Sequence, residues 1–180
     1  MDQKRSFYID GKKVFLREVR QSDVKQYYYQ WMNDPEINQY LETRFVPQSL
    51  DNIVRFVESK DGDQNEIFLA ICWKENEQHI GNIKLGPINW VHRFGEISLF
   101  VGDKNYWGKN IATEAIQLMT DYAFNTLNLH RVSAGCYSNN KGSAKAFQKA
   151  GFCIEGSCKE HFFSQGRYVD KILLGKVNYS

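Results

Sequence analysis

A glycine-centred loop that enters a strongly periodic helix is the first feature of the sequence that could do chemistry. It spans residues 104–115, KNYWGKNIATEA, and follows an apolar run of strand length. A helix start carries unpaired backbone N–H groups and the positive end of the helix dipole, and both suit a phosphate or pyrophosphate. A plain turn has the same composition, so the phosphate site is a hypothesis beside that simpler interpretation.

A second group of polar residues stands at the exit of the next predicted strand. It reads NNKGSAKAFQKAGF over residues 139–152. Asn139 or Asn140 suits the N-cap of a helix, and Gly151 falls where a left-handed residue commonly ends one. The two groups together favour a site for a phosphorylated cofactor.

Hydrophobic periodicity predicts the elements that must position these two groups. Helices are predicted from Ser22 or Asp23 through residue 31, over 50–60 behind Ser49, over 112–127 and over 143–150, with a restart at Asp34-Pro35. Strands are predicted over 14–17, 67–73, 80–88, 96–101 and 131–137, and from residue 152 a strand pairs with 168–177 across the turn SQGR. The three middle strands read as antiparallel hairpins.

Size, charge and cysteine spacing limit the class of protein. The chain has 180 residues and a net charge of +2, without a break in composition, which indicates one domain over residues 1–180. Basic and acidic residues are interspersed, which argues against a nucleic-acid partner. No apolar run approaches the roughly 20 residues of a membrane span, and the N-terminal MDQKRSFYID has no apolar signal core. A cytoplasmic location with no membrane partner is therefore expected.

The four cysteines form no CxxC pair and match no zinc spacing, so reduced thiols and no metal are expected. Cys136 lies inside an apolar strand without a paired base in sequence. It is interpreted as a buried structural thiol and not as an acyl-carrying nucleophile.

Several motifs in a fixed order resemble the GNAT superfamily of acyl-CoA-dependent N-acyltransferases, and within it the branch that includes the ribosomal-protein N-terminal alanine acetyltransferases. They are LREVRQSDV, WMNDPEI, IGNIKL, WGKNIATEAI, LNLHRV and NNKGSAKAFQKAGFCIEG, and they cover nearly the whole chain. The resemblance implies a mixed α/β fold. Its mostly antiparallel sheet of six to seven strands is splayed between the fourth and fifth strands, with about four flanking helices and acyl-CoA in the opening.

The resemblance also implies which residues hold acetyl-CoA. The family's pyrophosphate loop, Gln/Arg-x-x-Gly-x-Gly/Ala, corresponds to NYWGKN here, so Asn105 and Asn110 depart from the pattern. Because the family's contacts there are mainly backbone N–H groups, and Asn tolerates unusual backbone angles, binding is expected to survive. The implied cofactor residues are Leu99, Phe100, Val101, Trp107, Gly108, Lys109, Asn110, Ile111, Ala112, Thr113, Asn140, Ser143 and Phe147.

The same resemblance also implies which residues are catalytic. Many GNAT enzymes carry a tyrosine as general acid toward the thiolate, but Phe147 occupies that position and has no proton to give. Ser143, one helical turn earlier, resembles the serine of this branch and is either that acid or only a helix cap. The acceptor ammonium must lose a proton before it attacks, and Glu96 is the first choice of base, with His92 as the alternative.

The early helices, the loop between them and the final hairpin set acceptor specificity in this family. The residues expected there are Trp31, Glu42, Arg44, His92 and His161. The expected activity is acetyl transfer from acetyl-CoA to a primary amine, by direct attack in a ternary complex. The aromatic and arginine content of the early loop favours a peptide N-terminus or an amino sugar. A polyamine or aminoglycoside, a non-catalytic acyl-CoA-binding module and a homodimer remain open.

Overall fold

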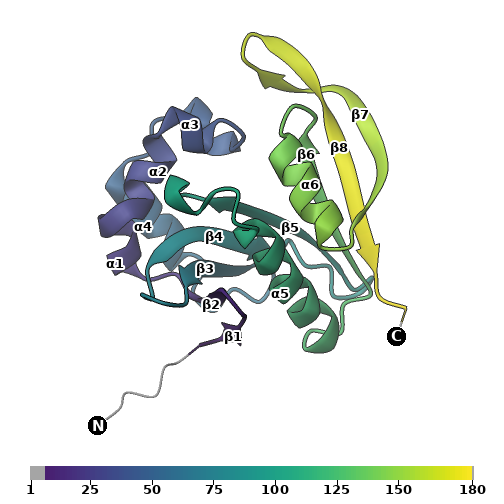
Figure 1. The fold of residues 1–180 in the computed structure, drawn as a ribbon, viewed down its shortest axis with the longest axis horizontal. Helices are drawn as coiled ribbons and strands as arrows, with labels where there is room; N and C mark the ends of the chain where they lie inside the picture. The colour runs from purple at the N-terminus through teal and green to yellow at the C-terminus, as the bar shows by residue number, and fades with distance from the viewer. Residues whose placement is uncertain (1–6, 180) are drawn as a thin grey trace.

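An eight-stranded sheet forms the centre of the molecule in the computed structural model, which describes residues 7–179 (Figure 1). Its order is β1-β2-β3-β4-β5-β6-β8-β7, and only the β5 and β6 pair is parallel. The strands are β1 (Ile9–Asp10), β2 (Val14–Glu18), β3 (Ile67–Trp73), β4 (His79–Leu85), β5 (Phe94–Val101), β6 (Arg131–Tyr137), β7 (Cys153–Ser164) and β8 (Arg167–Val177).

The structure confirms the mixed α/β fold with a splayed, mostly antiparallel sheet. The expected count of six to seven strands is below the eight observed, and the two-residue strand β1 has no periodicity that a sequence pattern can reveal. Residues 1–6 of the segment expected to lack a signal core lie outside the described residues, as does residue 180.

The helices are α1 (Gln21–Asp23), α2 (Tyr29–Asn33), α3 (Pro35–Asn38), α4 (Leu50–Glu58), α5 (Ile111–Asn125) and α6 (Lys141–Lys149), with the π-helical η1 (Val24–Tyr28) and the 3₁₀ turns η2 (Glu42–Phe45) and η3 (Lys104–Tyr106). The segments α1, η1 and α2 follow one another without a break. No helix in the described part of the chain is long and apolar enough to span a membrane.

Side-chain caps begin two of these helices as expected. Asp34 accepts a hydrogen bond from Glu36 N at 2.8 Å, and Ser49 accepts one from Asn52 N at 3.1 Å. The first helix differs, because it begins at Gln21 and places Asp23 in its first turn. The Asp23 carboxylate reaches back to the backbone N–H of Arg20 at 2.8 Å, so it supports the helix start from inside.

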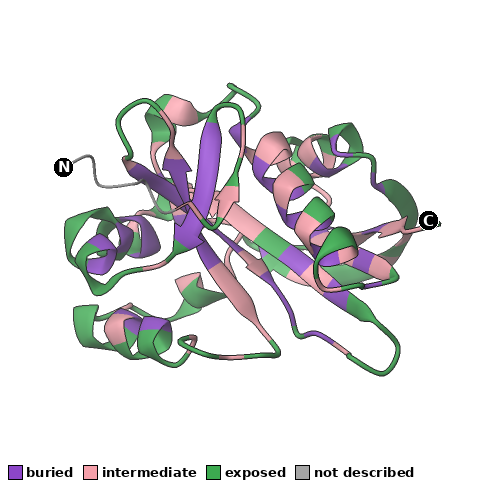
Figure 2. Ribbon diagram, turned by 90° about the horizontal axis from the view of Figure 1, so that it is seen from below, coloured by how far each residue is buried: buried purple, intermediate pink, exposed green. Residues whose placement is uncertain are grey.

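Helices cover both faces of the sheet, and buried residues lie along it in Figure 2. α5 and α6 pack on one face, where Leu69 and Ile71 join the largest core cluster. Segments α1 to α4 enclose a second core on the other face, which Phe68 and Phe100 contact from the sheet. The central strand β3 is therefore buried on both faces, which is why its sequence IFLAICW is apolar throughout and does not alternate.

The parallel contact between β5 and β6 is short. It joins Phe94, Gly95 and Glu96 to residues 131–133. Beyond Glu96, β5 continues to pair with β4, and β6 continues to pair with β8. The two halves of the sheet therefore separate beyond Glu96, which leaves an opening between residues 97–101 of β5 and 134–137 of β6.

Candidate active site

The opening exposes the backbone of β5 on one side. Glu96 O accepts a hydrogen bond from Gly86 N at 2.8 Å, so the backbone groups of the even-numbered residues of β5 face β4. Backbone direction alternates along a strand, so Ile97, Leu99 and Val101 turn their N–H and C=O groups toward the opening. The Trp107 indole donates to Val101 O at 2.8 Å, which ties the loop before α5 to the end of this edge.

Two left-handed residues shape the loop that leads into α5. Gly108 has φ 74° and Asn110, the residue that precedes the helix, has φ 62°. Asn110 stands at the last position of the family pattern, and asparagine tolerates this left-handed angle better than most residues with a side chain. No side chain among residues 7–179 caps α5, so the N–H groups of Ile111, Ala112 and Thr113 have no capping partner there. This loop combines free donors with a helix dipole.

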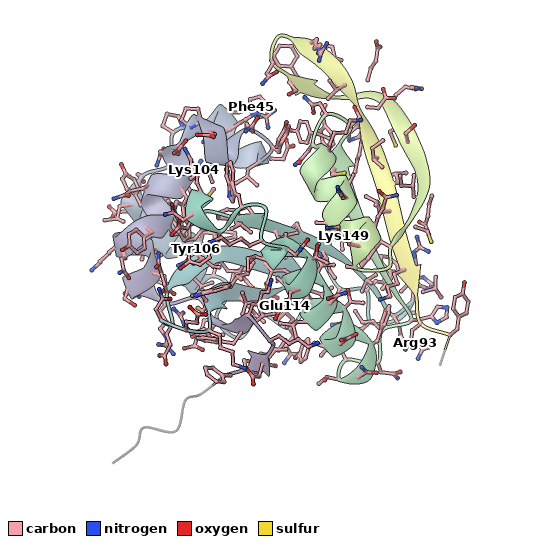
Figure 3. All side chains as sticks on the ribbon, viewed as in Figure 1. Phe45, Arg93, Lys104, Tyr106, Glu114 and Lys149 are labelled. Carbon is pink, nitrogen blue, oxygen red and sulfur yellow. The ribbon has the colours of Figure 1, made fainter. Side chains whose placement is uncertain are left out.

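Lysines surround the start of α5. Lys149 of α6 donates to Asn110 Oδ1 at 2.8 Å, and Lys13 donates to the carbonyl of Lys109 at 3.2 Å. The Lys109 ammonium lies 5.3 Å from the centroid of the Tyr106 ring. Figure 3 labels Lys149 and Tyr106 on either side of the start of α5. These contacts bring positive charge to the loop from two other elements, which favours an anionic ligand.

Glu114 fixes α5 against the strands behind it. Its Oε1 accepts hydrogen bonds from the backbone N–H groups of Lys12 and Lys13 at 2.6 and 2.8 Å. A carboxylate in the first turn of α5 thereby holds the turn between β1 and β2, and Glu114 is labelled in Figure 3. This role could not be predicted from the sequence, because Glu114 lies 102 and 101 residues from Lys12 and Lys13.

The second predicted group begins α6. Asn140 Oδ1 caps the helix by accepting from Ser143 N at 3.1 Å. The Ser143 hydroxyl donates to the thiol of Cys136, whose pKa burial raises despite that hydrogen bond. The thiol is therefore protonated at neutral pH, which agrees with a structural role for Cys136. Phe147 is 2% exposed and packs against Phe152, so the structure places it in the core and not on the opening.

Glu96 and a lysine meet on the other face of the opening. The side chain of Lys171, from β8, crosses β6 above Gly135, and its Nζ lies 3.1 Å from the position that a Cβ of Gly135 would occupy. Glu96 Oε1 lies 3.6 Å from the same position. A carboxylate and an ammonium therefore face one point beside the opening, although no ion pair joins them.

A clamp of four residues closes one end of this face: Glu42 and Arg44 of η2, Tyr137 of β6 and Phe163 of β7. The Tyr137 hydroxyl donates to Glu42 Oε1 at 2.7 Å and accepts from Arg44 Nη1 at 2.8 Å. Arg44 also donates to the carbonyl of Phe163 at 2.7 Å. Burial raises the pKa of Tyr137, which keeps its hydroxyl protonated. The structure thus brings Glu42 and Arg44 together, but their charged groups already have partners.

Two of the residues expected at the acceptor site lie away from it. Trp31 is 6% exposed and packs edge-on against Phe100 and His79, so it supports the end of β5 from the core. His92 is exposed in the turn before β5, at the closed end of the β5 and β6 contact, and Figure 3 shows its neighbour Arg93 far from Phe45 of η2. His161 is exposed on β7 beside Phe162.

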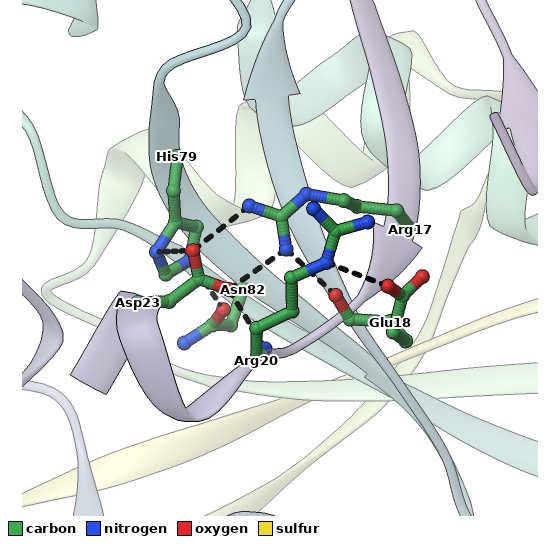
Figure 4. A network of polar contacts seen from close by, with 6 residues as sticks. All are labelled: Arg17, Glu18, Arg20, Asp23, His79 and Asn82. Carbon is green, nitrogen blue, oxygen red and sulfur yellow. Dashed lines mark hydrogen bonds and ion pairs between the residues drawn. The ribbon is translucent and has the colours of Figure 1, made fainter. Parts of the chain in front are cut away.

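A buried ion pair anchors the first helix behind Trp31 (Figure 4). Arg17 binds both carboxylate oxygens of Asp23, at 2.7 and 2.8 Å. Burial alone would raise the pKa of Asp23, but Arg17 holds it below its usual value. His79 Nε2 lies 2.8 Å from Asn82 Oδ1, and burial lowers the pKa of this histidine. The network links β2, α1 and β4.

Lys171 and Tyr137 are the residues that the sequence analysis missed. Tyr137 ends the predicted strand RVSAGCY and lies on the same face as Gly135, because side chains alternate along a strand. This alternation could have indicated from the sequence that Tyr137 faces the acceptor side. Lys171 has no comparable signal, because its place depends on the pairing of Tyr137 with Lys171 across β6 and β8. Within residues 7–179, no group of three or more His, Cys, Asp or Glu side chains is arranged to hold a metal ion.

Comparisons with known proteins agree with this arrangement. The profile of the Acetyltransferase (GNAT) domain matches residues 13–153. Uncharacterized N-acetyltransferase p20 of Bacillus licheniformis is 31% identical over 162 residues, which are 88% of this chain and 89% of that protein. Spermidine N(1)-acetyltransferase of Escherichia coli (strain K12) is 29% identical over 163 residues, covering 88% and 83% of the two chains.

Among solved structures, a spermidine N-acetyltransferase from Vibrio cholerae in complex with CoA and spermine has a TM-score of 0.83 and 25% identity. The match covers 93% of this chain and 96% of that chain. These relatives do not point to the ribosomal-protein alanine acetyltransferases, so the narrower resemblance is not supported.

Proposed function

Because the chain belongs to the GNAT acetyltransferase family and uses acetyl-CoA as its donor, we propose that it acetylates the primary amine of a small molecule by direct attack in a ternary complex. The observation that carries this proposal is the opening between β5 and β6, where the backbone edge of β5 has no strand partner. An unpaired edge beside an uncapped helix start fits an extended ligand that ends in phosphates.

The donor fits these residues as follows. The backbone groups of Leu99 and Val101 would bind its extended arm, and the N–H groups of residues 111–113 with the left-handed Gly108 and Asn110 would bind its pyrophosphate. Acetyl-CoA supplies an activated acetyl thioester. Asn140 remains available through its amide N–H groups, because only its oxygen caps α6.

Two side chains on opposite faces of the opening would manage the protons. An alkyl ammonium has a pKa near 10, so it must lose a proton before it attacks. The Glu96 carboxylate has no hydrogen-bond or ion-pair partner among the described residues and would accept that proton. The Ser143 hydroxyl lies on the α6 side, and it would turn its O–H from the Cys136 thiol to donate a hydrogen bond to the departing thiolate. The amine would thus enter on one face and the thiol leave on the other.

A linear polyamine is the acceptor that we favour. The relatives in Escherichia coli and Vibrio cholerae are named for spermidine. The alternative of a nucleotide-linked amino sugar relied on Arg44 for its diphosphate, but the Arg44 guanidinium already binds Leu41 O, Tyr137 Oη and Phe163 O. The free carboxylate of Glu96 suits an ammonium group.

The test is release of free thiol from acetyl-CoA with a panel of amines: spermidine, a peptide with a free N-terminus and a nucleotide-linked amino sugar. We expect the fastest release with spermidine. Glu96→Gln should lower kcat/KM at neutral pH and regain activity as the pH approaches the pKa of the amine, whereas exposed Glu160→Gln should behave as the native protein. Thermal stabilisation by acetyl-CoA without thiol release from any amine would instead support a non-catalytic binding module.

A further inference from the structure

Lys171 is an alkyl ammonium of the protein itself, held at the proposed acceptor site. Its side chain leaves β8, crosses β6 and ends above Gly135, two residues beyond Ser133, where the contact with β5 stops. Its Nζ and the Glu96 carboxylate are 3.1 and 3.6 Å from one point, the position of a Cβ on Gly135. The amine thus lies beside the residue proposed as base.

This ammonium differs from its neighbours in having no polar partner. Lys159 on the adjacent strand pairs with Asp170 at 2.9 Å, and Lys176 on the same strand donates to Ala150 O at 3.1 Å. Among residues 7–179, the Lys171 ammonium makes no hydrogen bond or ion pair, and it lies 5.9 Å from the centroid of the Phe162 ring. This ammonium is half-buried, and the Glu96 carboxylate is the charged group that faces the same point without pairing with it.

Gly135 leaves the room that this side chain fills. A Cβ at Gly135 would overlap Lys171 Cε, so any larger residue would displace the lysine from β6. Gly135 has no positive φ, so backbone conformation does not require glycine there. The absence of a side chain opens a path over β6 that is wide enough for a chain of methylene groups. Such a path also suits the aminobutyl end of spermidine.

We propose that Lys171 is an internal acetyl acceptor, so that the protein acetylates this lysine when acetyl-CoA is bound and no amine is present; this rests on the function proposed above. The Lys171 ammonium gives one proton to the Glu96 carboxylate, which passes it to water. Nζ then forms a bond to the acetyl carbonyl carbon while the carbon–sulfur bond breaks. The sulfur leaves with the bonding pair and takes the second proton of Nζ, so the products are acetyl-lysine, free CoA and one proton.

The modification would change the acceptor site. Acetylation removes the charge of Lys171 and leaves a neutral amide over Gly135, next to Glu96. An external amine competes with Lys171 for the same place, so spermidine should protect the lysine. The fraction of chains acetylated at Lys171 would therefore indicate how often the acceptor site holds no external amine.

The experiment incubates the native protein with acetyl-CoA alone, follows free thiol and locates the acetyl group by peptide mass spectrometry. We expect one acetyl group per chain on Lys171, at a rate independent of protein concentration and at least about tenfold faster than on the more exposed Lys159, because Lys171 is held at the site. Glu96→Gln should slow this labelling, spermidine should suppress it, and Lys171→Arg should remove it. The control Lys159→Arg should leave labelling of Lys171 unchanged.

Equal labelling of Lys171 and Lys159, or a rate that rises with protein concentration, would overturn the proposal. An unlabelled Lys171 together with thiol release from spermidine would also overturn it and leave the proposed function standing. If neither incubation released thiol, the proposed function itself would be wrong.

Discussion

Replacement of Gly108 by alanine tests the loop before α5 through its backbone alone. A Cβ at Gly108 meets no atom within 4 Å, so the variant creates no clash. Its φ of 74° is nevertheless left-handed, and a residue with a Cβ pays about 1–2 kcal/mol to adopt it. Because no packing holds this exposed residue, the free loop of the variant should relax and regain the native angle only when it binds. The affinity for acetyl-CoA should therefore fall about 5- to 30-fold.

Isothermal titration with acetyl-CoA, together with thermal unfolding of the free protein, measures this effect. Gly62→Ala is the matched control, because Gly62 has φ 70° and equally open space but lies in the loop after α4. The control should bind acetyl-CoA as the native protein does. An unchanged dissociation constant in Gly108→Ala would refute the assignment of this loop to the phosphates.

Other predictions concern the buried network and the clamp. Arg17→Met should lower the free energy of unfolding by about 3–5 kcal/mol, measured in urea, because Asp23 is left buried and unpaired, and Arg17→Met/Asp23→Asn should recover part of it. The pKa of His79 is lowered in the folded protein, so the unfolded state binds a proton on this histidine more readily, and the free energy of unfolding should fall as the pH drops below about 6.5. His92→Gln should keep this pH dependence of stability, whereas His79→Gln should weaken it. Tyr137→Phe removes two hydrogen bonds to η2, and it should raise the KM of the amine while leaving the affinity for acetyl-CoA unchanged. Steady-state kinetics would measure the KM and titration the cofactor affinity. A change in the cofactor affinity instead of the KM would contradict this prediction.

Local signals predicted the elements well. Asp34 before Pro35 and Ser49 before an amphipathic run act within a few residues, so their capping roles are legible in the sequence. The left-handed angle at Asn110 is also local, and it agrees with the tolerance expected of asparagine. The apolar spacing of α5 predicted its extent within a few residues.

The acceptor side was harder to predict, because it depends on how distant strands align. Trp31 and Arg44 have the residue types of a binding site. Trp31, however, is buried in the second core, and the Arg44 guanidinium already donates hydrogen bonds to three oxygen atoms. His92 is of a residue type that often serves as a base, but the direction of β5 places it at the closed end of the β5 and β6 contact. Lys171 reaches Gly135 only through the register of β6 and β8.

The three-residue contact between β5 and β6 also affects how the molecule opens in solution. Each half-sheet is held by longer antiparallel ladders, so separation of the halves should be a local fluctuation that requires less free energy than global unfolding. Backbone amides of residues 131–133 should then exchange with deuterium faster than those of the central strand β3. A ligand that spans the gap bonds to both halves, so its binding free energy should appear directly as slower exchange at this seam.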